Sequence, residues 1–322
     1  MVRHYLDFEI PLVELEREIE DLKRFSRDKQ LHFSDQLKNL EDKFHRLQKE
    51  IFSNLTGWQI TQLARHIDRP RLSHYIQWMF ETFIELHGDR TYGDDPAIMG
   101  GISKFNGRSV ILIGQQRGAD AKEMAYRNAG MPHPEGYRKA LRLMKMAEVF
   151  KKPVLTMIDT PGAFPGVGAE ERGIAEAIAK NLKIMMMLRT PILAIVIGEG
   201  GSGGALAIGI GDRILMLEYS VYSVITPEGC AAILWKDSKK KEVAAESLKL
   251  TANDLYRLGV IDEILKEPLG GAHRDPRGMA ESLKEVVERY LKELERMDIE
   301  ELLNMRYEKF RKMGTFVNGG TR

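Results

Sequence analysis

Five short apolar runs in the middle of the chain constrain its fold more than any other feature. They cover residues 97–102, 109–113, 153–158, 191–197 and 213–217. Most are nearly continuous, as in strands buried on both faces, and such strands are usually parallel and joined by helical crossovers. Residues 136–150 and 170–188 are predicted to be crossovers of this kind. The sequence therefore predicts an α/β domain with mostly parallel strands.

Charged helical segments flank this region on both sides. Apolar residues between 12 and 52 recur every three or four positions, in the stripes Leu12, Leu15, Ile19, Leu22 and Leu37, Leu40, Phe44, Leu47. This spacing predicts two helices, in a hairpin that packs against the fold or a partner. We expect an N-terminal helical extension over 1–70 and an α/β domain over 71–322, whose C-terminal helices begin at about 276 and cap the domain or contact a partner.

Composition limits the possible partners and the cellular setting. Lys plus Arg total 48 and Asp plus Glu total 47, so overall charge does not favour nucleic acid or a membrane surface as partner. The single cysteine, Cys230, excludes an internal disulfide, argues against a cysteine-based zinc site and is expected to be a small buried apolar residue. No apolar run approaches the ~20 residues of a membrane span, and the N-terminus lacks a signal sequence. We therefore expect a soluble, cytoplasmic protein.

A dense glycine run follows the fourth apolar run and gives the strongest indication of chemistry. Residues 192–197 lead into Gly-Glu-Gly-Gly-Ser-Gly-Gly at 198–204 and then into Ala-Leu-Ala. This pattern predicts a buried strand, a glycine turn and a helix. Free amides at a helix N-terminus can stabilise a developing oxyanion, and glycine lets a substrate approach the backbone closely. We therefore favour a functional site here over simple close packing.

The same run is compatible with two other chemistries. Gly198, Gly200 and Gly203 fit a dinucleotide-binding pattern, and Glu218 lies at a suitable distance for a ribose contact. The predicted helix from 203 to about 210 is short for that unit, which weighs against it without excluding it. Ser202 could also be a nucleophile with His273 as its base, but sequence spacing cannot bring the two together.

A second glycine-rich segment, 158–173, follows the third apolar run. Its Asp159-Thr160-Pro161-Gly162 resembles the magnesium-side motif of a GTPase, but the chain has no phosphate-binding loop of the required type. Loops after the carboxyl ends of parallel strands are preferred ligand sites. This segment is therefore interpreted as a wall of a binding site rather than a plain turn.

Two further segments concentrate charged residues. One is 88–90 together with Asp94 and Asp95, and the other is 267–276. Their side chains suit a metal cluster or a substrate clamp as well as they suit ion-paired turns. The residues alone leave these alternatives open.

Several of these segments together resemble the alpha subunit of bacterial acetyl-CoA carboxylase carboxyltransferase. They are 88–90, 134–144, 158–173, 198–209, 222–231 and 270–276, with 6–9 and 57–60 near the N-terminus. The resemblance covers nearly the whole chain. It implies a crotonase-like or Clp-protease-like α/β fold of repeated β-β-α units, with an N-terminal helical extension and C-terminal helices.

The resemblance also implies an activity and a set of partners. The reaction moves a carboxyl group from carboxybiotin, held covalently by the biotin carboxyl carrier protein, to acetyl-CoA. The product is malonyl-CoA, in the first committed step of fatty acid synthesis. An alpha2-beta2 heterotetramer is expected, with biotin carboxylase in the wider complex. Acetyl-CoA is expected largely on the beta subunit, which carries the zinc, so no metal is expected in this chain.

Site residues follow from the glycine segments and the resemblance. The amides of Gly203 and Gly204 are expected to be catalytic, as an oxyanion hole for the biotin ureido oxygen. Six residues are expected at the substrate: Gly200 and Gly201, which shape the turn, and Gly162, Phe164, Gly166 and Gly168, which line the wall. The rival interpretations are an acyl-CoA hydratase or a Ser202 peptidase on the same fold, an NAD-dependent oxidoreductase, and a non-catalytic scaffold.

Overall fold

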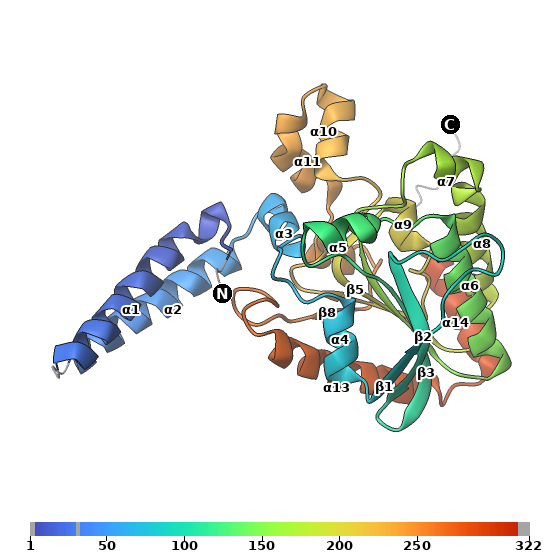
Figure 1. The fold of residues 1–322 in the computed structure, drawn as a ribbon, viewed down its shortest axis with the longest axis horizontal. Helices are drawn as coiled ribbons and strands as arrows, with labels where there is room; N and C mark the ends of the chain where they lie inside the picture. The colour runs from blue at the N-terminus through green and yellow to red at the C-terminus, as the bar shows by residue number, and fades with distance from the viewer. Residues whose placement is uncertain (1–3, 30–32, 315–322) are drawn as a thin grey trace, which may run out of the picture.

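The computed structural model describes residues 4–29 and 33–314 and is organised around one eight-stranded sheet (Figure 1). The order is β1 (Thr82–Glu85), β2 (Ile98–Phe105), β3 (Arg108–Gln115), β4 (Val154–Thr160), β5 (Ile192–Gly201), β6 (Arg213–Leu217) and β8 (Glu263–Leu265), with β7 (Val221–Ser223) paired to β5. The pairs β3–β4, β4–β5, β5–β6, β6–β8 and β5–β7 are parallel. The pairs β1–β2 and β2–β3 are antiparallel.

All five predicted runs form strands, and three strands were not predicted. The additional strands are β1, β7 and β8, which are only three or four residues long. The antiparallel pair β2–β3 was missed as well. Its tight turn contains Asn106 and Gly107, both with positive φ (47° and 79°), which is the usual chemistry of a two-residue hairpin.

Helices cover both faces of the sheet, which explains the continuous apolar runs. Helices α6 (Pro134–Val149) and α8 (Ile174–Met187) pack on one face, and α4 (Leu72–Met79) and α13 (Pro276–Leu294) pack on the other. Neighbouring strand residues divide between these two cores: Ile158 and Val196 belong to the first, and Met157 and Ile197 to the second. The predicted crossover helices and double-sided burial are confirmed.

The C-terminal segment consists of helices α13 and α14 (Ile299–Arg311), in agreement with the helices expected from about 276. Helix α14 is anchored by Arg306, which is 1% exposed. Its guanidinium donates to both oxygens of Asp212, at 2.7 and 2.8 Å, and to three backbone carbonyls. The helix is therefore fixed to the domain through the buried Arg306 and Leu302, while most of its other side chains remain at the surface.

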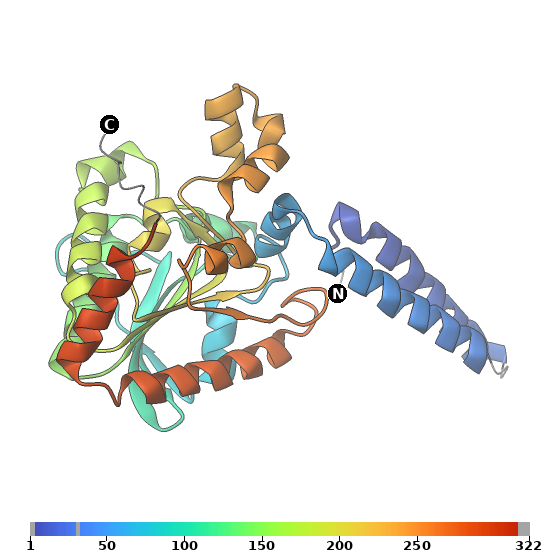
Figure 2. The ribbon, with the colours of Figure 1, turned by 180° about the vertical axis from the view of Figure 1, so that it is seen from behind.

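The N-terminal segment forms the predicted hairpin of α1 (Ile10–Lys29) and α2 (Ser34–Ser53), which projects from the sheet domain (Figures 1 and 2). Its base joins the body: Leu12 and Phe52 are buried in a cluster with Tyr219. A short η1 turn (Asp7–Glu9) precedes the hairpin, and α3 (Gly57–Ala64) follows it and packs on β5. Residues 1–3 lie outside the described part.

Short helices gather where the central strands end. Helices α5 (Ala121–Tyr126), α7 (Val167–Glu171) and α9 (Ser202–Leu206) follow β3, β4 and β5 respectively, and Figure 1 shows them along one side of the sheet. Helices α10 (Pro227–Trp235) and α11 (Lys241–Leu248) project beyond this side, and Cys230 is buried between them, as predicted. The remaining elements are η2 (Asn128–Gly130), η3 (Ser238–Lys240) and α12 (Ala252–Arg257). Across 4–29 and 33–314, no helix has the length and apolarity of a bilayer span.

Candidate functional site

The glycine run does not form the predicted turn. Strand β5 continues through Gly201, and Gly200 and Gly201 pair with Tyr222 and Ser223 of β7. The bend comes at Ser202, whose φ is +48°. The expectation that Gly200 and Gly201 shape a turn was therefore wrong. Strand β7 supplies backbone partners that a local sequence window does not reveal.

Close approach of neighbouring segments explains two of these glycines. A Cβ on Gly201 would lie 2.1 Å from the carbonyl oxygen of Pro161, and one on Gly200 would lie 2.7 Å from the ring of Tyr222. Real Cβ atoms do not approach other atoms so closely, so side chains are excluded at both positions. The close approach is to this protein's own backbone and side chains.

Helix α9 spans only Ser202–Leu206, so the predicted helix to about 210 was too long. Its first amides, those of Ser202, Gly203 and Gly204, have no acceptor within the helix. A Cβ on Gly204 would lie 2.4 Å from the backbone of Gly162, whereas one on Gly203 would meet only Ile178, at 3.5 Å. Glycine is thus required at Gly204 by packing, and Gly203 has room beside it.

The loop after β4 meets this helix through Gly162. Thr160 fixes the loop, because its hydroxyl donates to the Gly162 carbonyl at 2.7 Å and accepts from the Gly162 amide at 3.1 Å. Further along, the Phe164 ring lies over His133, with centroids 4.2 Å apart, and blocks any side chain on Gly166. Gly168 lies in α7 beside Arg172. The structure therefore brings Gly162 against Gly204, and the other three wall residues contact different neighbours.

Gln115, the last residue of β3, is a contact that sequence reasoning missed. It is fully buried, donates to the Gly204 carbonyl at 3.0 Å and accepts from the Asp159 amide at 3.2 Å. It thereby ties the ends of β3 and β4 to α9. A polar pair, Gln115-Gln116, which follows the second apolar run after Gly114, was the available indication in the sequence.

An ion-pair network lies beside the same end of β5. Glu199 is 4% exposed and accepts from Arg65 at 2.6 Å and from Arg117 at 2.7 Å. Burial alone would raise the pKa of Glu199, but the two guanidinium groups outweigh it and hold that pKa below its usual range. Arg65 also binds Glu228 of α10. The segment after α3 is therefore tied both to the glycine run and to the projecting helices.

Comparison with known proteins places this arrangement in a family. A family profile described as "Acetyl co-enzyme A carboxylase carboxyltransferase-like" matches residues 5–314. Similar proteins include acetyl-coenzyme A carboxylase carboxyl transferase alpha subunits from Geobacter metallireducens, 57% identical over 98% of this chain and 99% of the relative, and from Halalkalibacterium halodurans, 56% identical over 97% and 96%. The chain belongs to the alpha-subunit family of acetyl-CoA carboxylase carboxyltransferases. It is thus an enzyme subunit that transfers carboxyl groups.

Solved structures support the fold of this carboxyltransferase chain. A Pseudomonas malonate decarboxylase hetero-tetramer superposes with a TM-score of 0.56 and 16% identity, over 67% of this chain and 86% of that one. The beta subunit of P. aeruginosa geranyl-CoA carboxylase gives 0.55 and 15% identity, over 81% and 47%. At such low sequence identity, these superpositions show a shared fold and nothing about activity. The predicted crotonase-like fold is confirmed.

The dinucleotide interpretation does not fit the carboxyltransferase chain. Gly198 and Gly200 lie within β5, and the helix that follows has five residues. Glu218 accepts from Lys266 and from the Glu267 amide, so its carboxylate is already engaged. The sequence has the glycine spacing of a dinucleotide-binding motif, but these glycines do not form the loop that binds the pyrophosphate.

The charged segments are ion-paired turns. Asp89 accepts from three loop amides and from Arg138 at 2.7 Å. Burial would raise the pKa of Asp89, but these donors lower it to about 2. Asp94 binds Lys139 at 2.6 Å, whereas burial raises the pKa of Asp95 to about 6. The 267–276 segment is held mainly by Glu267, through the buried Arg69 at 2.5 Å.

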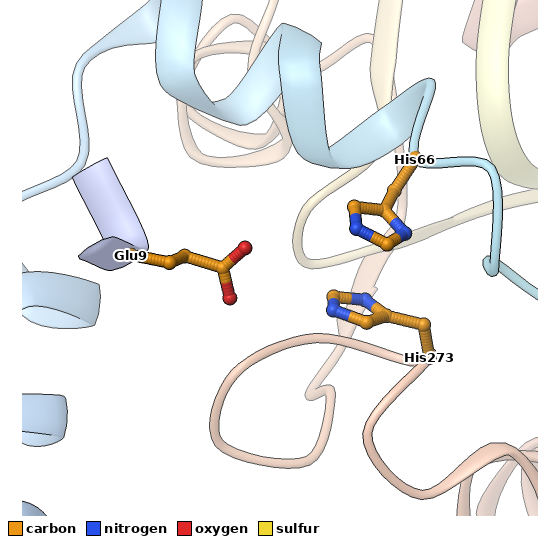
Figure 3. Close-up of side chains that lie close together, drawn as sticks. All are labelled: Glu9, His66 and His273. Atoms are coloured by element: carbon orange, nitrogen blue, oxygen red, sulfur yellow. The ribbon is translucent and has the colours of Figure 1, made fainter. Parts of the chain in front are cut away.

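Glu9, His66 and His273 converge between the N-terminal segment and the 267–276 segment (Figure 3). The two imidazole rings are stacked, with centroids 4.0 Å apart and planes 15° apart. Imidazole nitrogens bind a metal in the ring plane at ~2.0–2.1 Å, so two rings stacked face to face in separate planes cannot both point a nitrogen at one ion. Glu9 already accepts from Arg274 at 2.8 Å. The group therefore lacks the geometry of a metal site, and His273 is packed against His66 rather than bonded to Ser202.

Proposed function

We propose that this chain provides one side of a shared active site in which a carboxyl group passes from carboxybiotin to acetyl-CoA, giving malonyl-CoA. The observation that carries the proposal is the N-terminus of α9, where the Gly203 and Gly204 amides lack helical acceptors and a Cβ on Gly203 would make only an ordinary contact, with Ile178 at 3.5 Å. Donors of this kind are aimed at charge that develops in the transition state. Both residues therefore act through their backbone.

The residues around α9 hold these donors in place. Gly204 and Gly162 pack backbone to backbone, and Gln115 fixes the Gly204 carbonyl. When bound, biotin supplies the carboxyl group and, after losing it, a base for the acetyl methyl proton. The Gly203 and Gly204 amides would stabilise the negative charge that develops on the ureido oxygen as the bond between nitrogen and the carboxyl carbon breaks. That charge would be lost when biotin takes the methyl proton, and the methyl carbon would then bond to the released carboxyl carbon. Each such donor is worth about 3–4 kcal/mol in related sites.

The remaining predicted residues surround this centre. We assign Gly162 to the wall nearest the donors, because its backbone contacts Gly204. Phe164, Gly166 and Gly168 extend the same wall toward α7. Gly200 and Gly201 serve as strand residues whose lack of side chains lets β5 approach Pro161 and Tyr222. Their role is to let β5 pack closely against its neighbours next to the Gly203 and Gly204 amides.

The proposal includes the partners that complete the site. A beta subunit that carries zinc and holds most of the acetyl-CoA joins this chain in an alpha2-beta2 heterotetramer. The biotin carboxyl carrier protein brings its covalent biotin to α9, biotin carboxylase belongs to the wider complex, and the assembly works in the cytoplasm. Residues 1–70 form the helical extension and 71–322 the catalytic domain, within which the C-terminal helices from about 276 close the fold. The projecting α1–α2 and α10–α11 pairs support partner contacts of this kind.

Carboxyl transfer from malonyl-CoA to a biotin derivative tests the proposal. The assay compares this chain alone, its beta partner alone and the two mixed. Activity only in the mixture supports a shared site. A mixture shown to be assembled by size-exclusion chromatography, yet inactive, would contradict it. A hydratase would instead turn over an enoyl thioester without the partner chain.

A further inference from the structure

A cavity of about 400 Å³ lies near the glycine run but is separate from it. It is formed by the segment after α3, residues 64–71, and by the loop and helix 117–124, with Asp159 also in its wall. None of the glycines of the run lines it. The proposed carboxyl transfer at α9 therefore leaves this cavity without a role.

Charged side chains dominate the polar lining of this cavity. Those that face it are Arg65, Arg69, Arg71, Arg117, Asp120 and Asp159. The carboxylates that pair with Arg65 and Arg69, namely Glu199, Glu228 and Glu267, are not part of the lining. Asp120 is engaged as the N-cap of α5, where it accepts from the Glu123 amide at 2.8 Å. The cavity therefore presents more cationic than anionic groups.

Arg71 is the cation with the fewest partners here. Its guanidinium donates to the carbonyl of Ile67, in its own loop, and within 4–29 and 33–314 no carboxylate lies within 4.0 Å of it. Burial and the neighbouring Arg117 lower the pKa of Arg71, and the carboxylates that oppose this effect lie further away. A guanidinium has five N–H donors, so most of those of Arg71 remain available.

Arg117 contributes a second guanidinium to the lining of the same cavity. One of its terminal nitrogens donates to Glu199 at 2.7 Å. Its Nε is buried and makes no hydrogen bond, although an oxygen of Asp159 lies 3.3 Å away. A buried donor without a hydrogen bond is costly, so the surroundings of Arg117 leave it incompletely paired. Two partly unsatisfied guanidinium groups thus border one cavity.

We propose that this cavity is a binding site for a small oxyanion, a carboxylate or phosphate group, held between Arg71 and Arg117. Guanidinium forks match both groups and often bind them through paired hydrogen bonds. Asp159 and Glu199 already balance Arg117 and Arg65, so the anion would neutralise the charge of Arg71. The site does not depend on the proposed carboxyl transfer and uses none of its donors.

Binding of two probe anions, inorganic phosphate and malonate, tests this site by isothermal titration calorimetry. The full chain is titrated alone and assembled with its partner subunit. We expect saturable binding of at least one anion, weakened about 10- to 100-fold by Arg71→Ala. Arg71→Lys should be intermediate, because it keeps the charge and loses the fork. Preference for malonate identifies a planar carboxylate ligand, and preference for phosphate a tetrahedral one.

Arg90→Ala is the matched control. Arg90 also donates to a loop carbonyl, that of His87 at 2.8 Å, but it is exposed and does not line the cavity. Its substitution should leave anion binding unchanged, and circular dichroism should show both alanine variants folded. The proposal is overturned if neither anion binds the wild-type chain saturably, or if Arg71→Ala binds as tightly as wild type. Neither outcome depends on carboxyl-transfer activity.

Discussion

The C-terminal end of β5 makes different kinds of contact on its two sides. On the α9 side, glycine backbones touch: Gly201 meets Pro161, and Gly204 meets Gly162. On the α3 side, charged side chains form the contacts, with Arg65 and Arg117 on Glu199 and Arg69 on Glu267. The end of β5 therefore has backbone contacts between residues with little or no side chain on its α9 side and ion pairs between charged side chains on its α3 side.

This difference shows how the site is held rigid. A glycine surface can present donors without side chains in the way, but it contributes little cohesion of its own. Charge-assisted hydrogen bonds on the opposite side are shorter and stronger than neutral ones and fix the same strand. Arg69 does this directly, because its Nε donates to the Ile197 carbonyl at 2.8 Å. The α3 side should therefore govern stability, and the α9 side should govern catalysis.

Arg69→Ala should produce the largest effect, and it should be on stability. Arg69 is 4% exposed and pairs with Glu267, whose side chain is fully buried. Removal of one partner leaves a buried, uncompensated charge, which costs about 3–5 kcal/mol in free energy of unfolding. Denaturant unfolding followed by circular dichroism measures this loss. The exposed pair Lys23–Glu41 is the control, because Lys23→Ala should cost no more than about 1 kcal/mol.

The central sheet could be predicted because burial on both faces leaves a direct trace in the sequence. Runs such as 191–197 are apolar throughout, so periodicity and length identify them. The short edge strands β1 and β8 carry no such trace, because a few partly buried residues do not form a pattern. The β2–β3 hairpin could have been predicted, since Asn106-Gly107 between two apolar runs is a strong turn indicator.

The two sides of the candidate site differ in the same way. Glycine density marked Gly203 and Gly204, because close backbone approach restricts residue type locally. The α3 side depends on pairs far apart in the sequence, such as Arg65 with Glu199 and Arg69 with Glu267, separated by 134 and 198 positions. Nothing in one sequence says which of many charged residues will meet. Gln115 was missed for the same reason.

Gly204→Ala should give the next largest effect, and it should be on turnover. Its Cβ would lie 2.4 Å from the backbone of Gly162, so α9 or the loop must move away from the position that aims the amides. Loss of one such donor costs about 10²- to 10³-fold in turnover. Carboxyl transfer by the assembled complex measures it.

Gly203→Ala is the matched variant, because its Cβ meets only Ile178, at 3.5 Å, and its amide is kept. Its effect on turnover should be much smaller than that of Gly204→Ala. Full activity of Gly204→Ala in an assembled complex would remove the α9 amides from the mechanism. Equal losses in both variants would mean that space beside Gly203, rather than the position of the amides, is limiting.

Acid should weaken the α3 side through His273. Burial, the stacked His66 and two nearby arginines lower the pKa of His273 from 6.5 to about 3, so the folded state disfavours the protonated ring. The stabilising contribution is complete above pH 6.5 and is lost as the pH falls from there toward 3, by about 2 kcal/mol at pH 5. Urea unfolding at pH 7 and pH 5 measures it.

His273→Phe keeps a stacked ring without a titrating group, so its loss of stability between pH 7 and pH 5 should be smaller than that of wild type by the same amount. The comparison between the two proteins cancels other titrations, including that of Asp95, whose raised pKa acts in the opposite direction. An identical pH dependence in both proteins would show that His273 is not held neutral by its surroundings.

Glu199→Gln should give the smallest effect and connects the two sides. The amide keeps the shape of the side chain but loses the charge that binds Arg65 and Arg117, so the strand just before Gly200 is held less firmly. We expect about a tenfold fall in turnover, equivalent to about 1.4 kcal/mol in activation free energy. Glu218→Gln is the control, since its side-chain partner Lys266 is exposed and Glu218 pairs with neither Arg65 nor Arg117. If both variants keep full turnover while Glu199→Gln lowers the melting temperature, the arginine layer stabilises the fold without positioning the amides, and the two sides of β5 act independently.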